Sequence, residues 1–544
     1  SRAASPSTIM RPALSTLLSP RINTPSQARP SLRASLLMLA GLCLAQIQPA
    51  GAAPLWFENG QPNAQAQQAL TWLKQAADDG LAPQDYAAEQ LQQAFSRPSS
   101  NEENLNQLDE ALTRSMQRYL SDLRFGRVDP RTIHTNFNVR TADKSTIEAN
   151  LRSAVAEQRL GELWQQSQPP LPVYGALRKA LAQYRQLQQH PALQTTLPPL
   201  PGRKLQPGQP YSGMAALAQR LMALGDMPAN SPVPANYGGA LQDGVKAFQK
   251  RHGLESDGII GKGTFEQLNV APAARVRQIE LSMERLRWTP LLQAQRMIVV
   301  NVPEFVLRAY DLNNGKPDIK VTMNVIVGKA LDTATPLFDE DMRFIEFSPY
   351  WNIPISIARA ETIPKLRRNP AFFEQQGLEF VSNSGQVSRT LSNANLDAVL
   401  RGQMRIRQRP GPKNALGDIK FVFPNNDNIY LHHTPAPQLF KRDRRDFSHG
   451  CIRVEEPVAL ARFVLRDMPE WTEARIEEAM TKGESATLRL KEPLPVLIAY
   501  TTALADDKGK VYFFADIYQR DPPLDKALQR RPAISREAQS STQQ

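Results

Sequence analysis

Apolar side chains recur every three or four residues along the first third of the chain, and none of the segments there alternates with a period of two. This spacing lines apolar groups along one face of a helix. Residues 60–205 are therefore predicted to form a helical domain whose apolar stripes pack together. The stripes include Leu70, Leu73 and Ala77, then Leu108, Leu112 and Met116, then Leu177, Leu181 and Tyr184.

A second, smaller helical unit is predicted over residues 210–272. It follows a proline-rich stretch at 188–209, which is typical of a linker. Asp257 and Gly258 form a tight-turn signal between the second helix and a short third one. The apolar positions of the first two helices are Leu217, Leu221 and Leu224, and Leu241, Val245 and Phe248.

The period changes at Met297, where alternating and β-branched segments begin. These segments predict a mostly β domain over residues 290–518, with Asn313-Asn314-Gly315 as a hairpin turn. A polar, partly helical insertion at 354–407 interrupts the strands, and the polar tail at 520–544 is predicted to be disordered. The fold class is therefore multidomain α+β.

The N-terminal 53 residues contain five arginines and no Lys, Asp or Glu. They include a short apolar run at 35–45 and a small-residue site at 50–52. This pattern predicts a signal peptide or an N-terminal anchor over residues 1–53 and hence a periplasmic location, with Cys43 inside the leader. A buried helix is the alternative interpretation.

The net charge of +12 permits nucleic acid, an acidic membrane surface or an anionic polymer as the partner. No nucleic-acid-binding motif accompanies the charge, so nucleic acid is not expected. The chain has two cysteines. If the leader is removed, Cys451 is the single thiol and cannot form an internal disulfide.

Three of the six histidines lie within one short stretch that leads to Cys451. A thiolate is a strong nucleophile, and an imidazole can take the thiol proton and later return it to a leaving amine. His432 lies on a probable strand, where it shares a face with Tyr430. Gly450 permits a tight turn before Cys451, so that nearby backbone N–H groups can point at a developing oxyanion.

Two other interpretations fit the isolated residues. The cysteine and histidines can be ordinary buried or loop residues. They can also ligate zinc, although His432 and His433 diverge on a strand and the spacing differs from that of a zinc finger.

The motif His432, fifteen residues, then Ser-His-Gly-Cys-Ile-Arg at 448–453 resembles the active-site signature of the L,D-transpeptidases (YkuD-type catalytic domain). Residues 239–269 resemble a type 1 peptidoglycan-binding module. Further strings resemble the large, scaffold-bearing YcbB-like subgroup. They are LRFGRVDP (123–130), SPYWNIP (348–354), RPGPKNALG (409–417) and KFVFPN (420–425).

The resemblance implies a role for each matched residue. Cys451 corresponds to the acylated nucleophile and His432 to the general base and acid. Gly450 and Cys451 would supply oxyanion-hole amides, and the backbone carbonyl of His433 would orient the imidazole. This subgroup usually carries Asp at position 433. Ser448, His449 and Arg453 would shape the pocket, and Tyr430 and Trp351 are candidate substrate-wall residues.

The family acts on peptidoglycan stem peptides and needs no metal, nucleotide or other cofactor. The resemblance implies a 3→3 cross-linking activity through a thioester, with release of D-Ala, and acylation of Cys451 by carbapenems. The insertion at 354–407 would act as a lid. An L,D-carboxypeptidase on the same site and a non-catalytic wall-binding scaffold are the alternatives. Peptidoglycan is the expected partner, with other wall-synthesis proteins as further candidates.

Overall fold

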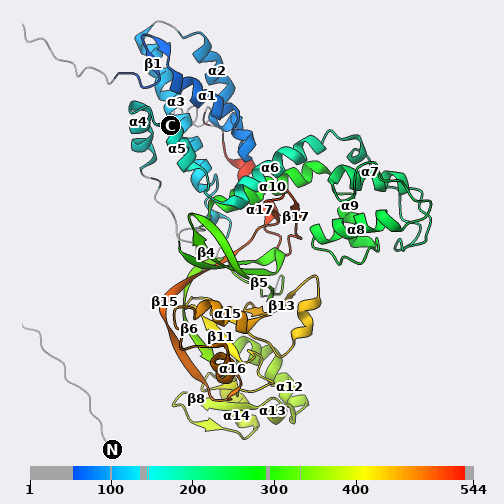
Figure 1. The fold of residues 1–544 in the computed structure, drawn as a ribbon. Helices are drawn as coiled ribbons and strands as arrows, with labels where there is room; N and C mark the ends of the chain where they lie inside the picture. Colours follow the sequence, from blue (N-terminus) through cyan, green and yellow to red (C-terminus); the bar gives the residue numbers. More distant parts are fainter. Residues whose placement is uncertain are drawn as a thin grey trace, which may run out of the picture. The chain divides into compact units, whose positions relative to one another are not determined.

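The computed structural model describes residues 53–98, 101–134, 144, 146–289, 294–330, 333–532 and 534. Apart from Ala53, the predicted leader with Cys43 lies outside the described residues. Within those ranges, the helices are too short or too polar to cross a bilayer. Helical regions and a mostly β region follow one another along the chain, which confirms the multidomain α+β prediction (Figure 1).

The N-terminal helices pack around buried aromatic side chains. Trp56 and Tyr86 are fully enclosed, and Trp56 Nε1 donates to Thr113 Oγ1 at 2.9 Å. The side chains of Asn63 and Asn101 cap helices α1 and α3 by accepting backbone N–H groups. The elements are β1 (Phe57–Glu58), β2 (Gln61–Pro62), α1 (Ala64–Lys74), α2 (Ala88–Ser96), α3 (Glu102–Phe125), α4 (Ile147–Ala156), α5 (Leu160–Ser167) and α6 (Pro172–Leu187).

The second unit consists of three helices around one apolar core, as predicted. Gln249 fixes its tight turn, because Gln249 Oε1 accepts the Gly258 N–H at 2.9 Å while Gly258 adopts φ +74°. Buried Arg251 joins the unit to its neighbours by donating to Tyr184 Oη and Val511 O. The helices are α7 (Met214–Leu224), α8 (Gly239–Arg251) and α9 (Lys262–Leu268), followed by α10 (Pro272–Arg287), which packs along α6.

A nine-stranded sheet organises the C-terminal half, in the order β13-β5-β14-β12-β11-β6-β15-β3-β4. Strand β4 also pairs with β5, so the sheet closes on itself. The predicted hairpin turn joins β4 to β5 through Asn314 and Gly315, both at positive φ. The strands are β3 (Arg296–Asn301), β4 (Val306–Asn313), β5 (Lys316–Gly328), β6 (Phe338–Phe347), β11 (Ile419–Val422), β12 (Leu431–His432), β13 (Asp446–Ser448), β14 (Ile452–Val454) and β15 (Ala486–Ala499).

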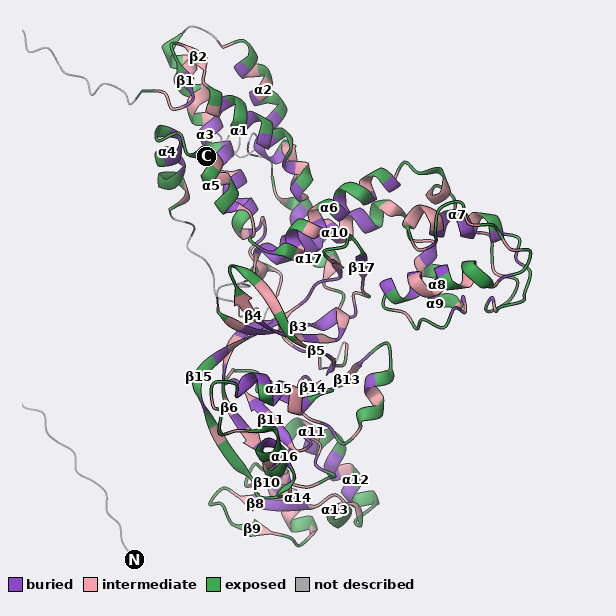
Figure 2. Ribbon diagram, in the orientation of Figure 1, coloured by how far each residue is buried: buried purple, intermediate pink, exposed green. Residues whose placement is uncertain are grey.

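An apolar core packs against one face of this sheet. Buried residues recur along its strands in Figure 2. Leu431 and Ile452 point into that core, where they join Leu460 of helix α15 and Ile476 of helix α16. Helix α15 spans Pro457–Val464 and α16 spans Glu473–Thr481. Because neighbouring residues on a strand alternate between faces, Tyr430 and His432 lie on the opposite face. The Cys451 side chain, just before β14, packs partly against the core.

The insertion forms a compact cap with its own apolar core. It combines short helices with a second sheet, ordered β7-β10-β8-β9. Its entry and exit strands lie side by side, since Asn352 and Arg407 are antiparallel partners. The elements are β7 (Trp351–Asn352), α11 (Ile355–Ile357), η6 (Ala358–Thr362), α12 (Ile363–Arg368), α13 (Phe372–Gln375), β8 (Leu378–Ser382), β9 (Val387–Ser388), α14 (Asn393–Leu400) and β10 (Met404–Gln408).

The prediction of a disordered tail from residue 520 is wrong for its first ten residues. After the hairpin β16 (Ala503–Ala505) and β17 (Val511–Phe513), the chain forms helix α17 (Asp521–Arg530). Leu524 and Leu528 lie four residues apart and are buried against apolar partners that include Val128 and Leu281. Helix α17 is therefore stabilised by packing against residues that are distant in the sequence.

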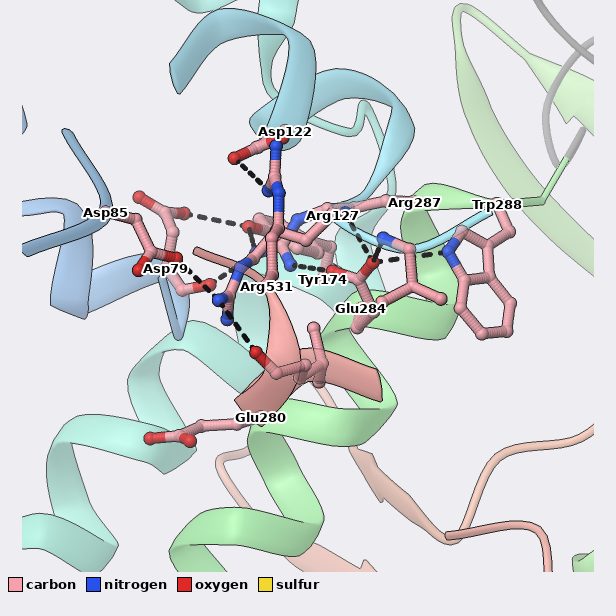
Figure 3. Close-up of polar contacts among 12 residues, drawn as sticks. Asp79, Asp85, Asp122, Arg127, Tyr174, Glu280, Glu284, Arg287, Trp288 and Arg531 are labelled. Carbon is pink, nitrogen blue, oxygen red and sulfur yellow. Dashed lines mark hydrogen bonds and ion pairs between the residues drawn. The ribbon is translucent and has the colours of Figure 1, made fainter. Parts of the chain in front are cut away.

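Charged side chains tie this C-terminal helix to the N-terminal helices (Figure 3). Arg531 Nη1 lies 2.6 Å from Asp122 Oδ2, and Arg127 Nη2 lies 2.5 Å from Asp85 Oδ2. Arg127 also donates to the Leu528 carbonyl. These groups are largely buried, so losing one partner would leave an uncompensated charge. These contacts hold the C-terminal helix against the N-terminal helical region.

Candidate active site

Strands β12 and β14 run parallel and bring the two predicted reactive residues into the same part of the sheet. His432 is in register with Arg453, and the Ile452 N–H donates to Tyr430 O at 3.1 Å. Cys451 directly precedes β14 and lies next to Tyr430, which comes two residues before His432. Tyr430 neighbours both groups, since its ring centre lies 5.8 Å from that of His432 and its side chain hydrogen-bonds with Cys451.

The His432 imidazole is buried and neutral. Its Nδ1 donates to the His433 carbonyl at 2.5 Å, so Nε2 carries no proton and can accept one. Burial lowers the pKa of His432 to about 3, and the nearby Arg453 and Lys420 charges act in the same direction. The carbonyl that the sequence assigns to orienting the ring is the one that holds it.

The Cys451 thiol is half-buried and also neutral at rest. Burial raises the pKa of Cys451, and hydrogen bonding to Tyr430 opposes part of that rise. The sulfur is 3.7 Å from the Asn428 carbonyl oxygen, an acceptor for the S–H. The resting arrangement is therefore a thiol and a neutral imidazole, with proton transfer left for the reaction itself.

The turn before Cys451 is rigid. Gly450 has φ +119°, a region that favours glycine, and an added Cβ would lie 3.2 Å from Ile429 Cδ1. Ser448 Oγ donates to Cys451 O and accepts the Gly450 N–H at 3.2 Å. The Gly450 amide is thus engaged within the turn, and its predicted place in an oxyanion hole stays a prediction.

Positive charge lies beside the reactive pair. Lys420 is the strand partner of His432, and its Nζ is 3.5 Å from Glu346 Oε2 and 4.2 Å from the Tyr430 ring centre. Among the described residues, no carboxylate pairs with Arg453. Burial lowers the pKa of the Arg453 guanidinium, and the neighbouring Cys451 opposes this. Arg453 therefore offers its donors to an incoming anion.

A side-chain contact joins the cap to the cysteine motif. His449 Nε2 is 2.7 Å from Glu361 Oε1, and Glu361 belongs to η6 of the cap. Both side chains retain substantial solvent exposure. This contact links the inserted segment to the residue two positions before the thiol.

Three family models match separate parts of the chain. The L,D-transpeptidase catalytic domain matches residues 295–482, a scaffold domain matches 48–181, and a peptidoglycan binding domain matches 211–268. The chain carries an L,D-transpeptidase catalytic domain.

A Haemophilus influenzae protein named as an L,D-transpeptidase is 30% identical over 251 residues. The match covers 46% of this chain and about half, 49%, of that relative. The crystal structure of an L,D-transpeptidase from Xylanimonas cellulosilytica is 16% identical, with a TM-score of 0.18, and covers 55% of this chain and 100% of its own. A TM-score that low does not bear on the fold.

One predicted substrate-wall residue lies in other surroundings. Trp351 packs against the apolar core of the cap. The His433 side chain turns to the opposite side of its strand, where its Nδ1 accepts the Asp418 N–H at 3.3 Å. Tyr430, by contrast, lies beside His432, with 5.8 Å between ring centres.

Sequence reasoning missed Lys420, Asn428 and Glu361. Lys420 could have been identified, because it belongs to the KFVFPN string (420–425), where it begins a segment of strand character. Asn428 has no sequence signal because it contacts the thiol through its backbone carbonyl. Glu361 has none because it lies in the insertion, far from His449 in the sequence. Among the described residues, no three His, Cys, Asp or Glu side chains gather as a metal site would require. A cavity of about 780 Å³ between α6, α10 and the outer strands does not include Cys451 or His432.

Proposed function

We propose that this protein cross-links peptidoglycan stem peptides through a thioester on Cys451, releasing D-Ala and forming 3→3 links. The observation that supports it best is that Tyr430 lies beside the unprotonated His432 imidazole and hydrogen-bonds with the Cys451 thiol. Arg453, which pairs with no carboxylate within the described part of the chain, adds a receptor for a stem carboxylate. Such a substrate requires export, in agreement with the basic leader predicted at residues 1–53.

The first half-reaction forms the thioester. His432 Nε2 takes the thiol proton as Sγ attacks the carbonyl carbon of the third stem residue, whose oxygen becomes an oxyanion. Collapse of this intermediate breaks the carbon–nitrogen bond to D-Ala. The departing amine takes the proton from His432, and D-Ala leaves.

The second half-reaction transfers the acyl group. The side-chain amine of diaminopimelate on another stem attacks the thioester carbon, and His432 accepts a proton from that amine. The carbon–sulfur bond breaks, and Cys451 recovers its proton. The thioester conserves the energy of the original amide, which suits a compartment without ATP.

Arg453 and Lys420 would attract the anionic stems. Arg453 would hold a stem carboxylate through its fork of donors. Lys420 is partly neutralised by Glu346 and would act through its longer-range field. These charges also disfavour protonation of His432, so the groups that attract the substrate also keep the imidazole in its neutral form.

The cap would exclude water from the thioester and thereby favour transfer over hydrolysis. Asn352 and Arg407 are strand partners, so a two-residue Asn-Gly turn can replace residues 353–406. Removing the cap should raise the ratio of hydrolysed tripeptide to cross-linked dimer severalfold. The milder Glu361→Ala variant keeps the cap and loses its contact with His449, and should shift the ratio less. An unchanged ratio in the cap-deleted protein would contradict the lid.

Incubation with a disaccharide-tetrapeptide tests the function. We expect a 3→3 dimer and free D-Ala, identified by chromatography and fragmentation of the products. Tripeptide without dimer would instead assign an L,D-carboxypeptidase. The absence of either product, with binding to isolated peptidoglycan retained, would leave a wall-binding scaffold.

A further inference from the structure

The peptide bond between Gly450 and Cys451 is held from its carbonyl side by a buried threonine. Thr335 Oγ1 lies 2.7 Å from Gly450 O, and Thr335 is completely enclosed. The same hydroxyl lies 2.9 Å from the Gly328 N–H. Gly328 is in tight contact with this turn, since a Cβ there would lie 3.0 Å from Gly450 Cα.

The direction of each hydrogen bond in this cluster is determined. The Gly328 N–H can only donate, so Thr335 Oγ1 accepts it, and the single hydroxyl proton is left for Gly450 O. The Thr335 N–H donates to Tyr518 Oη at 3.2 Å, and Tyr518 Oη in turn donates to Gly328 O at 2.7 Å. Three of these bonds close a ring through Gly328, Thr335 and Tyr518, and the fourth points outward from Thr335 to Gly450.

Fixing the Gly450 carbonyl also fixes the Cys451 amide. The two groups are opposite ends of one planar trans peptide, so they point in opposite directions. With Gly450 O turned inward to Thr335, the Cys451 N–H is directed away from the buried ring. This amide belongs to the residue whose sulfur would attack, and the Gly450 amide is occupied by Ser448 Oγ.

We propose that Thr335 is a positioning residue for the oxyanion hole, acting through the Gly450–Cys451 peptide plane to aim the Cys451 N–H at the developing oxyanion. This inference rests on the proposed function. Thr335 touches no substrate; it prevents the peptide from rotating when negative charge forms. Tyr518 supports Thr335 from the segment between β17 and α17, which gives the ordered C-terminal region a role at the active site.

The test compares Thr335→Val with Thr335→Ser in the full-length protein. Valine keeps the shape and removes the hydroxyl, whereas serine retains the donor. Thr113→Val is a matched control, because Thr113 is also buried, accepts a side-chain N–H and donates to a backbone carbonyl, but lies among the N-terminal helices. The readout is acylation of the thiol by a carbapenem, in which the lactam C–N bond breaks as the S–C bond forms, followed by intact-protein mass spectrometry.

We expect Thr335→Val to lower the maximal acylation rate about 10- to 100-fold, somewhat less than the loss of an oxyanion donor itself. The half-saturating carbapenem concentration should stay unchanged. Thr335→Ser should recover most of the rate, and Thr113→Val should match the wild type. If Thr335→Val reacts at the wild-type maximal rate, or if Thr335→Ser does not restore that rate, the inference about Thr335 is wrong while the proposed function is unaffected. If the wild-type protein forms no adduct, the inference and the proposed function fall together.

Discussion

Replacing Cys451 with serine is expected to reduce formation of cross-linked dimer and of free D-Ala by on the order of 10⁴-fold or more, as for loss of a nucleophile in other covalent enzymes. The serine hydroxyl fits the same place but gives up its proton far less readily than a thiol. A neutral imidazole whose pKa is about 3 is a weak base and does not compensate. The products are measured with the disaccharide-tetrapeptide substrate.

Ser448→Ala provides the comparison for Cys451→Ser. It removes the hydroxyl that braces the turn but keeps the nucleophile, so it should retain measurable turnover. Both variants should keep binding isolated peptidoglycan through residues 211–268. Dimer formation by Cys451→Ser within tenfold of the wild-type rate would refute the assignment of Cys451.

Replacing His432 with glutamine is expected to lower the acylation rate about 10²- to 10⁴-fold, the usual contribution of a general base. The amide cannot take the thiol proton, so the variant depends on the small fraction of Cys451 that ionises spontaneously. Because burial raises the pKa of that thiol, the variant's rate should climb about tenfold per pH unit between pH 6 and 8.

The wild-type protein should show a different pH profile. His432, with a pKa of about 3, stays unprotonated above pH 5, so the acid side of the profile should be flat from pH 8 down to pH 5. His433→Gln is the matched control, since it keeps the backbone carbonyl and alters an imidazole that faces Asp418. A wild-type rate that falls with a midpoint near pH 6.5 would show that His432 titrates as an exposed histidine.

The sequence was most informative where one local pattern determines the outcome. The helical stripes, the β4–β5 hairpin and the His432–Cys451 motif each depend on residues close together in the chain. Strand β6 escaped prediction because Asp339, Glu340 and Asp341 interrupt its apolar alternation, although the strand is central in the sheet. Its place is set by pairing with β11 and β15, which periodicity does not report.

Long-range contacts account for the other differences. Helix α17 has a short apolar repeat among charges, and its order depends on partners such as Asp122, more than 400 residues earlier. The support behind the cysteine turn comes from Thr335, 115 residues before Gly450. A single threonine in a loop gives no local indication of such a role. The motif therefore predicted the reactive groups, while their positioning required the fold.

The most direct test of the central claim is to capture the acyl-enzyme. The wild-type protein is mixed with the tetrapeptide donor, quenched in acid and analysed by intact mass and peptide mapping. We predict a mass increase equal to the donor minus D-Ala, located on Cys451 and removed by hydroxylamine. No adduct despite D-Ala release, or an adduct that persists in Cys451→Ala, would contradict covalent catalysis by this thiol.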